Sequence, residues 1–108
     1  MTFDIRLTDD ALHDLEEMDD YLVAHEGPEK ADYVLGKIEE AILVLRELPE
    51  RGHYPPELSS LGIREYREVF FKPYRIIYRV IGKCAYVYLI ADGRRDMQAL
   101  LARRLLGQ

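Results

Sequence analysis

Two arginines, Arg75 and Arg79, stand in the run KPYRIIYRV (residues 72–80), whose other residues are typical of a buried β-strand. An unpaired guanidinium is costly to bury, so we expect both side chains to point away from the core. Arginine makes bidentate hydrogen bonds with carboxylates and phosphates, and with tyrosine it is enriched at protein-binding hot spots. The pair therefore predicts a binding surface for an acidic partner. The alternative is that the two arginines form ion pairs on their own face of the sheet, with Glu65, Glu68 or Asp96.

A second set of residues has side chains that could transfer protons. His53 and Glu57 lie in PERGHYPPELSSLGI (residues 49–63), an irregular connection long enough for a small domain to suggest a function. Tyr86 and Tyr88 follow in the last predicted strand. A general acid or base must titrate near neutrality and reach the reacting group. The alternative is that His53 is an ordinary loop histidine and Glu57 an ordinary surface carboxylate.

Charge is divided unevenly along the chain. The net charge is −5 over 108 residues, but residues 1–50 hold 15 acidic and 4 basic side chains, and residues 51–108 hold 5 acidic and 11 basic ones. Both halves could be ordinary solvated faces, or the second half could carry a basic surface that meets an acidic partner. The C-terminal stretch concentrates the positive charge in a predicted basic rim, which consists of Arg94, Arg95, Arg103 and Arg104.

Length and composition limit the class of protein. A chain of 108 residues with 48% hydrophobic side chains suits one domain, which we place at residues 1–108. The single cysteine, Cys84, excludes an internal disulfide, and no Cys and His residues stand at zinc-ligand spacing, so we expect neither a metal nor a cofactor. No stretch approaches the apolar length of a membrane span, and the charged N-terminus does not resemble a secretion signal. We expect a cytoplasmic protein.

The N-terminal half predicts a strand followed by a helical hairpin. TFDIRL (residues 2–7) alternates apolar and charged residues as a half-buried strand does. Thr8 can cap a helix, Gly27 ends it, and Pro28 begins a second amphipathic helix that we expect to run over residues 28–48. A short glycine turn between two helices predicts an antiparallel hairpin that packs against a sheet.

The C-terminal half predicts three strands and a short helix. The strand-like runs are REYREVFF (residues 64–71), YRIIYRVI (74–81) and CAYVYLIA (84–91), and Gly82–Lys83 suits a type II′ turn between the last two. A regular register then pairs Ile81 with Cys84, and Arg75 with Ile90. One face of this hairpin should pack on the helices: Tyr74, Ile76, Tyr78, Val80, Ala85, Val87, Leu89 and Ala91. The other face should be open to a partner: Arg75, Ile77, Arg79, Tyr86 and Tyr88. The predicted fold is α+β in the order β-α-α-β-β-β-α, with a mostly antiparallel sheet.

Several of these runs together resemble the RelE/ParE superfamily of toxins from type II toxin–antitoxin (plasmid stabilisation) systems. The resemblance rests on LPERG…PEL…LGIREYRE, KPYRIIYRV, YVYLIADGRRD and the final LLARRLL, and it covers nearly the whole chain. It implies a toxin that a cognate antitoxin binds and neutralises in a hetero-oligomer.

The superfamily has two modes of action. RelE-like members are endoribonucleases that cleave mRNA on the ribosome without a metal, and ParE-like members inhibit DNA gyrase by binding. By resemblance, Arg75 matches the strand arginine of the nucleases and Arg95 the arginine after the last strand, with Glu57 and His53 as possible acid or base. Leu101 falls near the position where such nucleases often have a tyrosine, and it cannot transfer a proton.

These features favour the ParE-like branch, because a ribosome-directed toxin is usually strongly basic and this chain is acidic. We therefore expect a stoichiometric gyrase inhibitor rather than an enzyme, with no direct DNA binding by this chain alone and no membrane partner. The alternatives are the ribosome-dependent nuclease and a non-toxic relative that still binds an antitoxin. The residues expected to contact target or antitoxin are Arg75, Arg79, Tyr86, Tyr88, Arg94, Arg95, Arg103 and Arg104.

Overall fold

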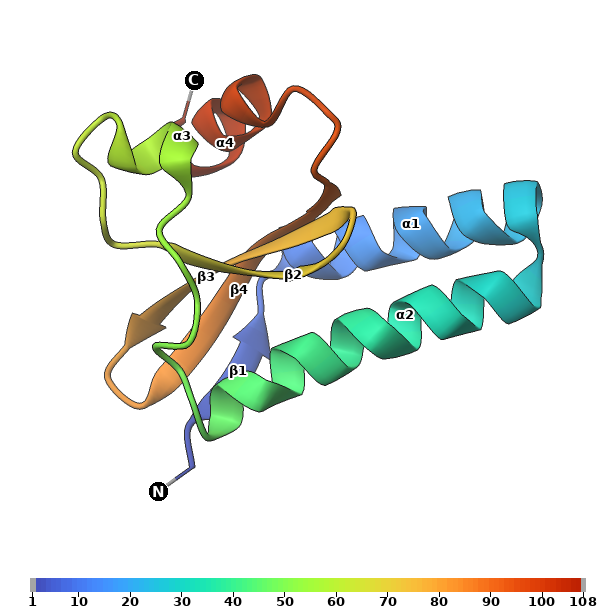
Figure 1. The fold of residues 1–108 in the computed structure, drawn as a ribbon, viewed down its shortest axis with the longest axis horizontal. Helices are drawn as coiled ribbons and strands as arrows, with labels where there is room; N and C mark the ends of the chain where they lie inside the picture. Colours follow the sequence, from blue (N-terminus) through green and yellow to red (C-terminus); the bar gives the residue numbers. More distant parts are fainter. Residues whose placement is uncertain (1, 108) are drawn as a thin grey trace.

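A four-stranded sheet forms the centre of the computed structural model, which describes residues 2–107 (Figure 1). Its strands are β1 (Asp4–Leu7), β2 (Arg67–Phe71), β3 (Tyr74–Ile81) and β4 (Cys84–Asp92), in the spatial order β1-β4-β3-β2. β1 runs parallel to β4, and the other neighbours are antiparallel. The predicted α+β class and mostly antiparallel sheet are confirmed. Between residues 2 and 107 no helix is long and apolar enough to cross a membrane.

Helices α1 (Asp9–Glu26) and α2 (Pro28–Leu43) form the predicted hairpin. The Thr8 hydroxyl accepts a hydrogen bond from the Ala11 N–H at 3.1 Å, and Gly27 turns the chain at φ +92°. Their apolar stripes pack on one face of the sheet in a core that includes Leu22, Ile38, Ile76, Tyr78 and Val87.

The second helix ends earlier than the predicted residue 48. After Leu43 the chain tightens into the 3₁₀ turn η1 (Val44–Arg46), which buries Leu45 completely. Proline disfavours helical geometry in the residue before it, so the helix could not continue smoothly into Pro49.

Two short helices cover part of the other face of the sheet. These are α3 (Pro56–Ser59), inside the long connection, and α4 (Met97–Leu105), whose first turn is capped by Asp96. They lie beside each other in Figure 1, and they form a second core of Leu58, Ile77, Leu89, Ala91, Met97, Leu100 and Leu101. The prediction that this whole face is open is therefore wrong. Arg79 and Tyr86, nearer the Gly82 turn, remain half-buried.

The β3–β4 hairpin contains a β-bulge that the regular register did not predict. The expected pairing holds from Ile81 with Cys84 to Tyr78 with Val87, and Gly82 has φ +61°. The pairing then skips Tyr88, so that Ile77 lies opposite Leu89 and Arg75 opposite Ala91. Because one extra residue reverses every later side chain, Leu89 and Ala91 face α3 and α4 instead of the helical hairpin. Their predicted position on the hairpin face is wrong.

Candidate functional site

The Arg75 side chain lies between two carboxylates on the face that α3 and α4 cover. Its Nε donates to Glu68 Oε1 at 2.7 Å, and its two terminal nitrogens each donate to one Glu57 oxygen at 2.7 Å. The side chain of Arg75 is only 11% exposed. Its predicted exposure is therefore wrong, and the alternative of an ion pair with Glu68 is confirmed. We call these three residues the Arg75 cluster.

The Arg75 cluster depends on close packing around the arginine stem. Gly93, just after β4, lies against this stem, where an added Cβ would be 2.8 Å from Arg75 Cδ. Real Cβ contacts are essentially never this short, so a larger residue would displace either the arginine or the turn. The glycine in DGRRD therefore makes room for Arg75.

The electrostatics of the Arg75 cluster oppose the approach of another anion. Hydrogen bonding to Glu57 raises the pKa of Arg75, so the guanidinium stays charged. The Arg75 hydrogen bonds lower the pKa of Glu57. Burial raises the pKa of Glu68, which is 2% exposed, although the Arg75 hydrogen bond works against this shift. The two carboxylates thus already hold both bidentate-capable terminal nitrogens and the Nε of Arg75, which a phosphate would have to share with them.

An aromatic and basic surface lies beside this cluster, on the less covered part of the same face. Arg79 and Tyr86 are cross-strand partners, and the Arg79 guanidinium lies 5.8 Å from the centre of the Tyr66 ring. The Tyr66 ring meets the Tyr88 ring edge to face at a centroid distance of 5.5 Å. We call Tyr66, Arg79, Tyr86 and Tyr88 the arginine–tyrosine surface.

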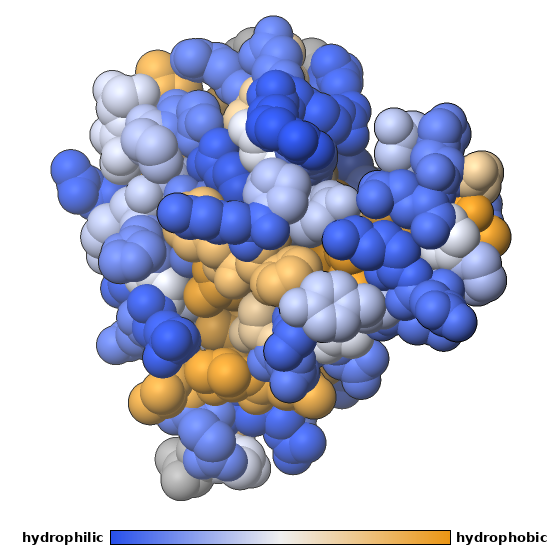
Figure 2. All heavy atoms as spheres, turned by 45° about the vertical axis from the view of Figure 1, so that its right-hand side comes forward, coloured by the Kyte–Doolittle hydropathy of each residue, from blue (hydrophilic) through white to orange (hydrophobic). Residues whose placement is uncertain are grey.

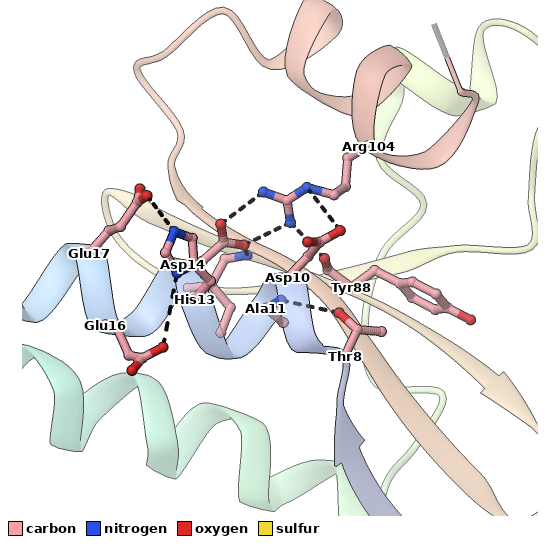
Figure 3. Close-up of polar contacts among 10 residues, drawn as sticks. Thr8, Asp10, Ala11, His13, Asp14, Glu16, Glu17, Tyr88 and Arg104 are labelled. Carbon is pink, nitrogen blue, oxygen red and sulfur yellow. Dashed lines mark hydrogen bonds and ion pairs between the residues drawn. The ribbon is translucent and has the colours of Figure 1, made fainter.

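The four C-terminal arginines do not form one rim. Arg94 is exposed and paired with Asp92 at 2.6 Å, and Arg95 and Arg103 are also exposed. Arg104 instead turns toward α1, where its terminal nitrogens donate to both Asp14 oxygens at 2.8 and 2.9 Å (Figure 3). Its side chain is 20% exposed. The expectation that Arg104 belongs to an exposed rim is wrong.

A groove of about 680 Å³ runs between β1 and α2. β1 forms one edge of the sheet, so its outer side is not paired with another strand. Figure 2 shows apolar side chains gathered in the lower centre of one face, with hydrophilic residues around them. The apolar lining consists of Ile5, Leu7, Leu15, Leu35, Ile38, Ile42 and Leu43, and the charged residues are Asp4, Arg6, Glu39 and Arg46. The groove combines a strand edge with an apolar floor.

The sequence profile described as "ParE toxin of type II toxin-antitoxin system, parDE" matches residues 5–97. The chain belongs to the ParE toxin family. No curated protein sequence matches it.

Solved toxin structures share the fold of this ParE-family chain. A chain from the chromosomal ParDE toxin–antitoxin system of P. aeruginosa is 25% identical, with a TM-score of 0.70, 84% of this chain covered and 96% of that one. A chain of the RelBE2 toxin–antitoxin complex from Mycobacterium tuberculosis is 17% identical, with a TM-score of 0.61 and coverages of 85% and 99%. An arginine double mutant of the E. coli toxin RelE in the free state is 13% identical, with a TM-score of 0.66 and coverages of 97% and 99%.

The residues expected to act if this ParE-family toxin were a nuclease are only partly brought together. Glu57 and Arg75 are in direct contact. His53 and Glu68 exchange two backbone hydrogen bonds, with N···O distances of 3.0 and 2.7 Å, and His53 is exposed. Arg95 lines a different groove, between α1 and the end of β4, together with Tyr21. In the described part of the chain, no group of three or more His, Cys, Asp or Glu side chains could hold a metal ion.

Sequence reasoning missed Tyr66 and a neighbouring cluster around Tyr54. The Tyr54 ring lies 5.6 Å from the Arg64 guanidinium and 4.7 Å from that of Arg67. Tyr66 could have been found, because it stands two residues before Glu68 and so shares its face when the β2 alternation is extended toward the N-terminus. Tyr54 carries no such signal, because it lies in an irregular segment.

Proposed function

We propose that this ParE-family toxin inhibits DNA gyrase by stoichiometric binding and does not cleave RNA. The observation that carries the proposal is the state of Arg75. This residue matches the strand arginine of nuclease relatives, but here it is 11% exposed and each of its three nitrogens already donates to Glu57 or Glu68. An arginine that stabilises a reacting phosphate must present free donors to it.

The residues available for proton transfer support the same conclusion. Both Glu57 oxygens accept hydrogen bonds from Arg75, and the lowered pKa of Glu57 makes it a weak base near neutrality. Leu101, at the position where related nucleases often have a tyrosine, is 1% exposed and has no group that titrates.

The arginine–tyrosine surface is the proposed target contact, with the exposed Arg94, Arg95 and Arg103 as additional charges. Arginine and tyrosine combine a large contact area with fixed hydrogen-bonding groups, which is why they dominate binding hot spots. The net charge of −5 argues against direct DNA binding by this chain alone. A gyrase target also implies a cytoplasmic location.

The groove between β1 and α2 is the proposed site for a cognate antitoxin. The P. aeruginosa and M. tuberculosis relatives come from toxin–antitoxin systems, and this supports an antitoxin partner here. An extended antitoxin segment could add to the free edge of β1 and place apolar side chains against Leu35 and Leu43. A segment that folds on binding can cover such a long surface with few residues.

Gyrase supercoiling and mRNA cleavage, measured with the same purified protein, test the target. We expect supercoiling to be inhibited in proportion to toxin concentration, and mRNA in translating extracts to stay intact. Arg79→Ala and Tyr86→Ala should weaken the inhibition, whereas Asp20→Ala on the exposed side of α1 should not. Normal supercoiling at saturating toxin, together with cleavage at codon positions, would favour the ribosome-dependent nuclease. Absence of both effects and of growth inhibition would favour a non-toxic relative.

A further inference from the structure

The edge of β4 is protected by two different means along its length. β1 pairs with Cys84 to Val87, and the Thr8 N–H then donates to the Val87 carbonyl at 3.0 Å. Beyond this point β1 has ended. Two side chains from distant parts of the chain take its place: Asp14 of α1 and Arg104 of α4 (Figure 3).

These two side chains bind the backbone of β4 on both sides of Leu89. Asp14 Oδ2 accepts from the Ile90 N–H at 3.0 Å, and Arg104 Nη1 donates to the Tyr88 carbonyl at 2.9 Å. A buried backbone group without a partner costs free energy comparable to a lost hydrogen bond. The Asp14–Arg104 pair therefore satisfies a stretch of strand that would otherwise need another strand beside it.

Asp14 and Arg104 also hold each other. Arg104 donates to both Asp14 oxygens at 2.8 and 2.9 Å, and the two side chains are 12% and 20% exposed. Each charge is thus neutralised where little water reaches it. Arg104 Nε also lies 3.9 Å from Asp10 Oδ2, so without Asp14 the arginine would keep only this longer contact with an exposed carboxylate. The ion pair and the two backbone contacts form one unit.

This unit lies at the β-bulge. Tyr88, whose carbonyl binds Arg104, is the residue that the β3–β4 pairing skips. A regular register would pair Tyr88 with Ile77 and would turn Leu89 toward the helical hairpin. Since Leu89 and Ile90 are both apolar, the hydrophobic pattern alone selects weakly between the two registers.

We propose that Asp14 and Arg104 are positioning residues, which hold the β-bulge at Tyr88. They fix the backbone from which the Tyr88 ring contacts Tyr66 in the arginine–tyrosine surface, and they turn Leu89 and Ala91 toward α3 and α4. The effect on the target rests on the proposed function. The effect on the strand does not, so the two can be measured separately.

A charge-swap variant, Asp14→Arg with Arg104→Asp, tests the strand effect by NMR. It keeps opposite charges in place, but arginine at position 14 cannot accept from the Ile90 N–H and aspartate at position 104 cannot donate to the Tyr88 carbonyl. We expect the Ile90 amide to exchange about tenfold faster, the effect of one lost hydrogen bond, with Val80 as internal reference. Leu89 should also lose its contact with the apolar cluster of α3 and α4. A swap variant that keeps both features would overturn the proposal.

If the swap variant does not fold, two single variants at position 14 test the same strand effect. Asp14→Asn keeps an oxygen that can accept from the Ile90 N–H, whereas Asp14→Ala does not. The proposal requires slower Ile90 exchange in Asp14→Asn than in Asp14→Ala, and equal exchange rates would overturn it. Asp20→Asn is the same change at an exposed position of α1, and its Ile90 amide should exchange at the rate of the natural protein.

Growth inhibition then separates this inference from the proposed target surface. Tyr88→Ala removes the ring but keeps the carbonyl that Arg104 binds. We expect both Tyr88→Ala and the swap variant to lose growth inhibition. If the swap variant shows the expected NMR changes while Tyr88→Ala remains fully toxic, the positioning role stands and the proposed target surface is wrong.

Discussion

The Arg75 guanidinium and the Glu57 carboxylate meet at two points, with both nitrogen–oxygen distances at 2.7 Å. This contact joins β3 to α3, which otherwise sits in an irregular connection. Leu58, next to Glu57, is 1% exposed in the same apolar cluster as Ile77. Ion pair and apolar contact together fix α3 on the sheet.

Arg75→Ala should destabilise the protein far more than Arg79→Ala. Without Arg75, the buried Glu68 carboxylate loses its ion-pair partner, a change that typically costs about 3–5 kcal/mol. Arg79 makes a half-exposed contact with the Tyr66 ring, so its loss should cost less than about 1 kcal/mol. Denaturant unfolding of both variants measures the difference. Equal losses would mean that the Arg75 cluster does not stabilise the fold as its geometry implies.

Gly93→Ala should disturb the Arg75 cluster without touching any of its charges. The added methyl group would lie 2.8 Å from Arg75 Cδ and 3.0 Å from the Pro73 carbonyl oxygen, so either the arginine or the turn must move. We expect a loss of about 1–3 kcal/mol, the range for overpacking a close contact.

Gly36→Ala is the matched control for this change. Gly36 lies within α2, and nothing stands within 4 Å of its added Cβ. Alanine should therefore stabilise the helix by about 0.5–1 kcal/mol. Thermal unfolding of the two variants should show shifts of opposite sign, and a stabilised Gly93→Ala would contradict the packing argument.

The sequence was sufficient to predict elements that depend on local chemistry. Thr8 as a cap, Gly27 as a helix end and Gly82 in the hairpin turn each act within a few residues, and all three are found as predicted. The family was predicted from the resemblance to RelE/ParE toxins, because that resemblance rests on motifs spread over the whole chain.

The bulge could not be predicted, because it depends on contacts that are distant along the chain. Asp14 and Arg104 stand 90 positions apart, and nothing near Tyr88 signals that they meet there. The same reason explains the error at Arg75. The predicted direction of its side chain was correct, but its pairing with Glu57 depends on how the long connection folds back over the sheet.

The two glutamates of the Arg75 cluster should affect stability in opposite ways as pH changes. The Arg75 hydrogen bonds lower the folded-state pKa of Glu57 below 4.5, so Glu57 adds stability above pH 4.5 that is lost as pH falls through the lowered value. Burial raises the folded-state pKa of Glu68 above 4.5. Its ionisation therefore costs stability as pH rises from 4.5 through the raised value.

Glutamine variants separate these two effects. Glu57→Gln should be less stable than the natural protein at neutral pH, and the difference should shrink as pH falls below 4.5. Glu68→Gln keeps an oxygen for Arg75 Nε without a buried charge. Its free energy of unfolding should therefore rise relative to that of the natural protein as pH rises above 4.5. Urea unfolding between about pH 3 and pH 8 measures both curves. If the free energy of unfolding of both variants depends on pH as that of the natural protein does, the opposite effects of Glu57 and Glu68 are both wrong.

Leu43→Glu should weaken antitoxin binding while toxicity remains. Leu43 lines the groove between β1 and α2 and is 49% exposed, so the glutamate can be solvated without unfolding the chain. A bound antitoxin segment would instead trap this charge against apolar side chains, which should lower affinity at least about tenfold. Calorimetric titration with the antitoxin measures the affinity, and a growth assay with and without antitoxin measures the toxicity.

Leu12→Glu is the matched control, because Leu12 is 48% exposed on α1 and lies outside that groove. It introduces the same charge at nearly the same exposure, so it should leave antitoxin affinity unchanged. Arg79→Ala should show the opposite result to Leu43→Glu, with antitoxin binding kept and toxicity lost, because the two residues belong to separate surfaces. Equal loss of affinity in the Leu43 and Leu12 variants would mean that added acidic charge, and not the groove, determines binding.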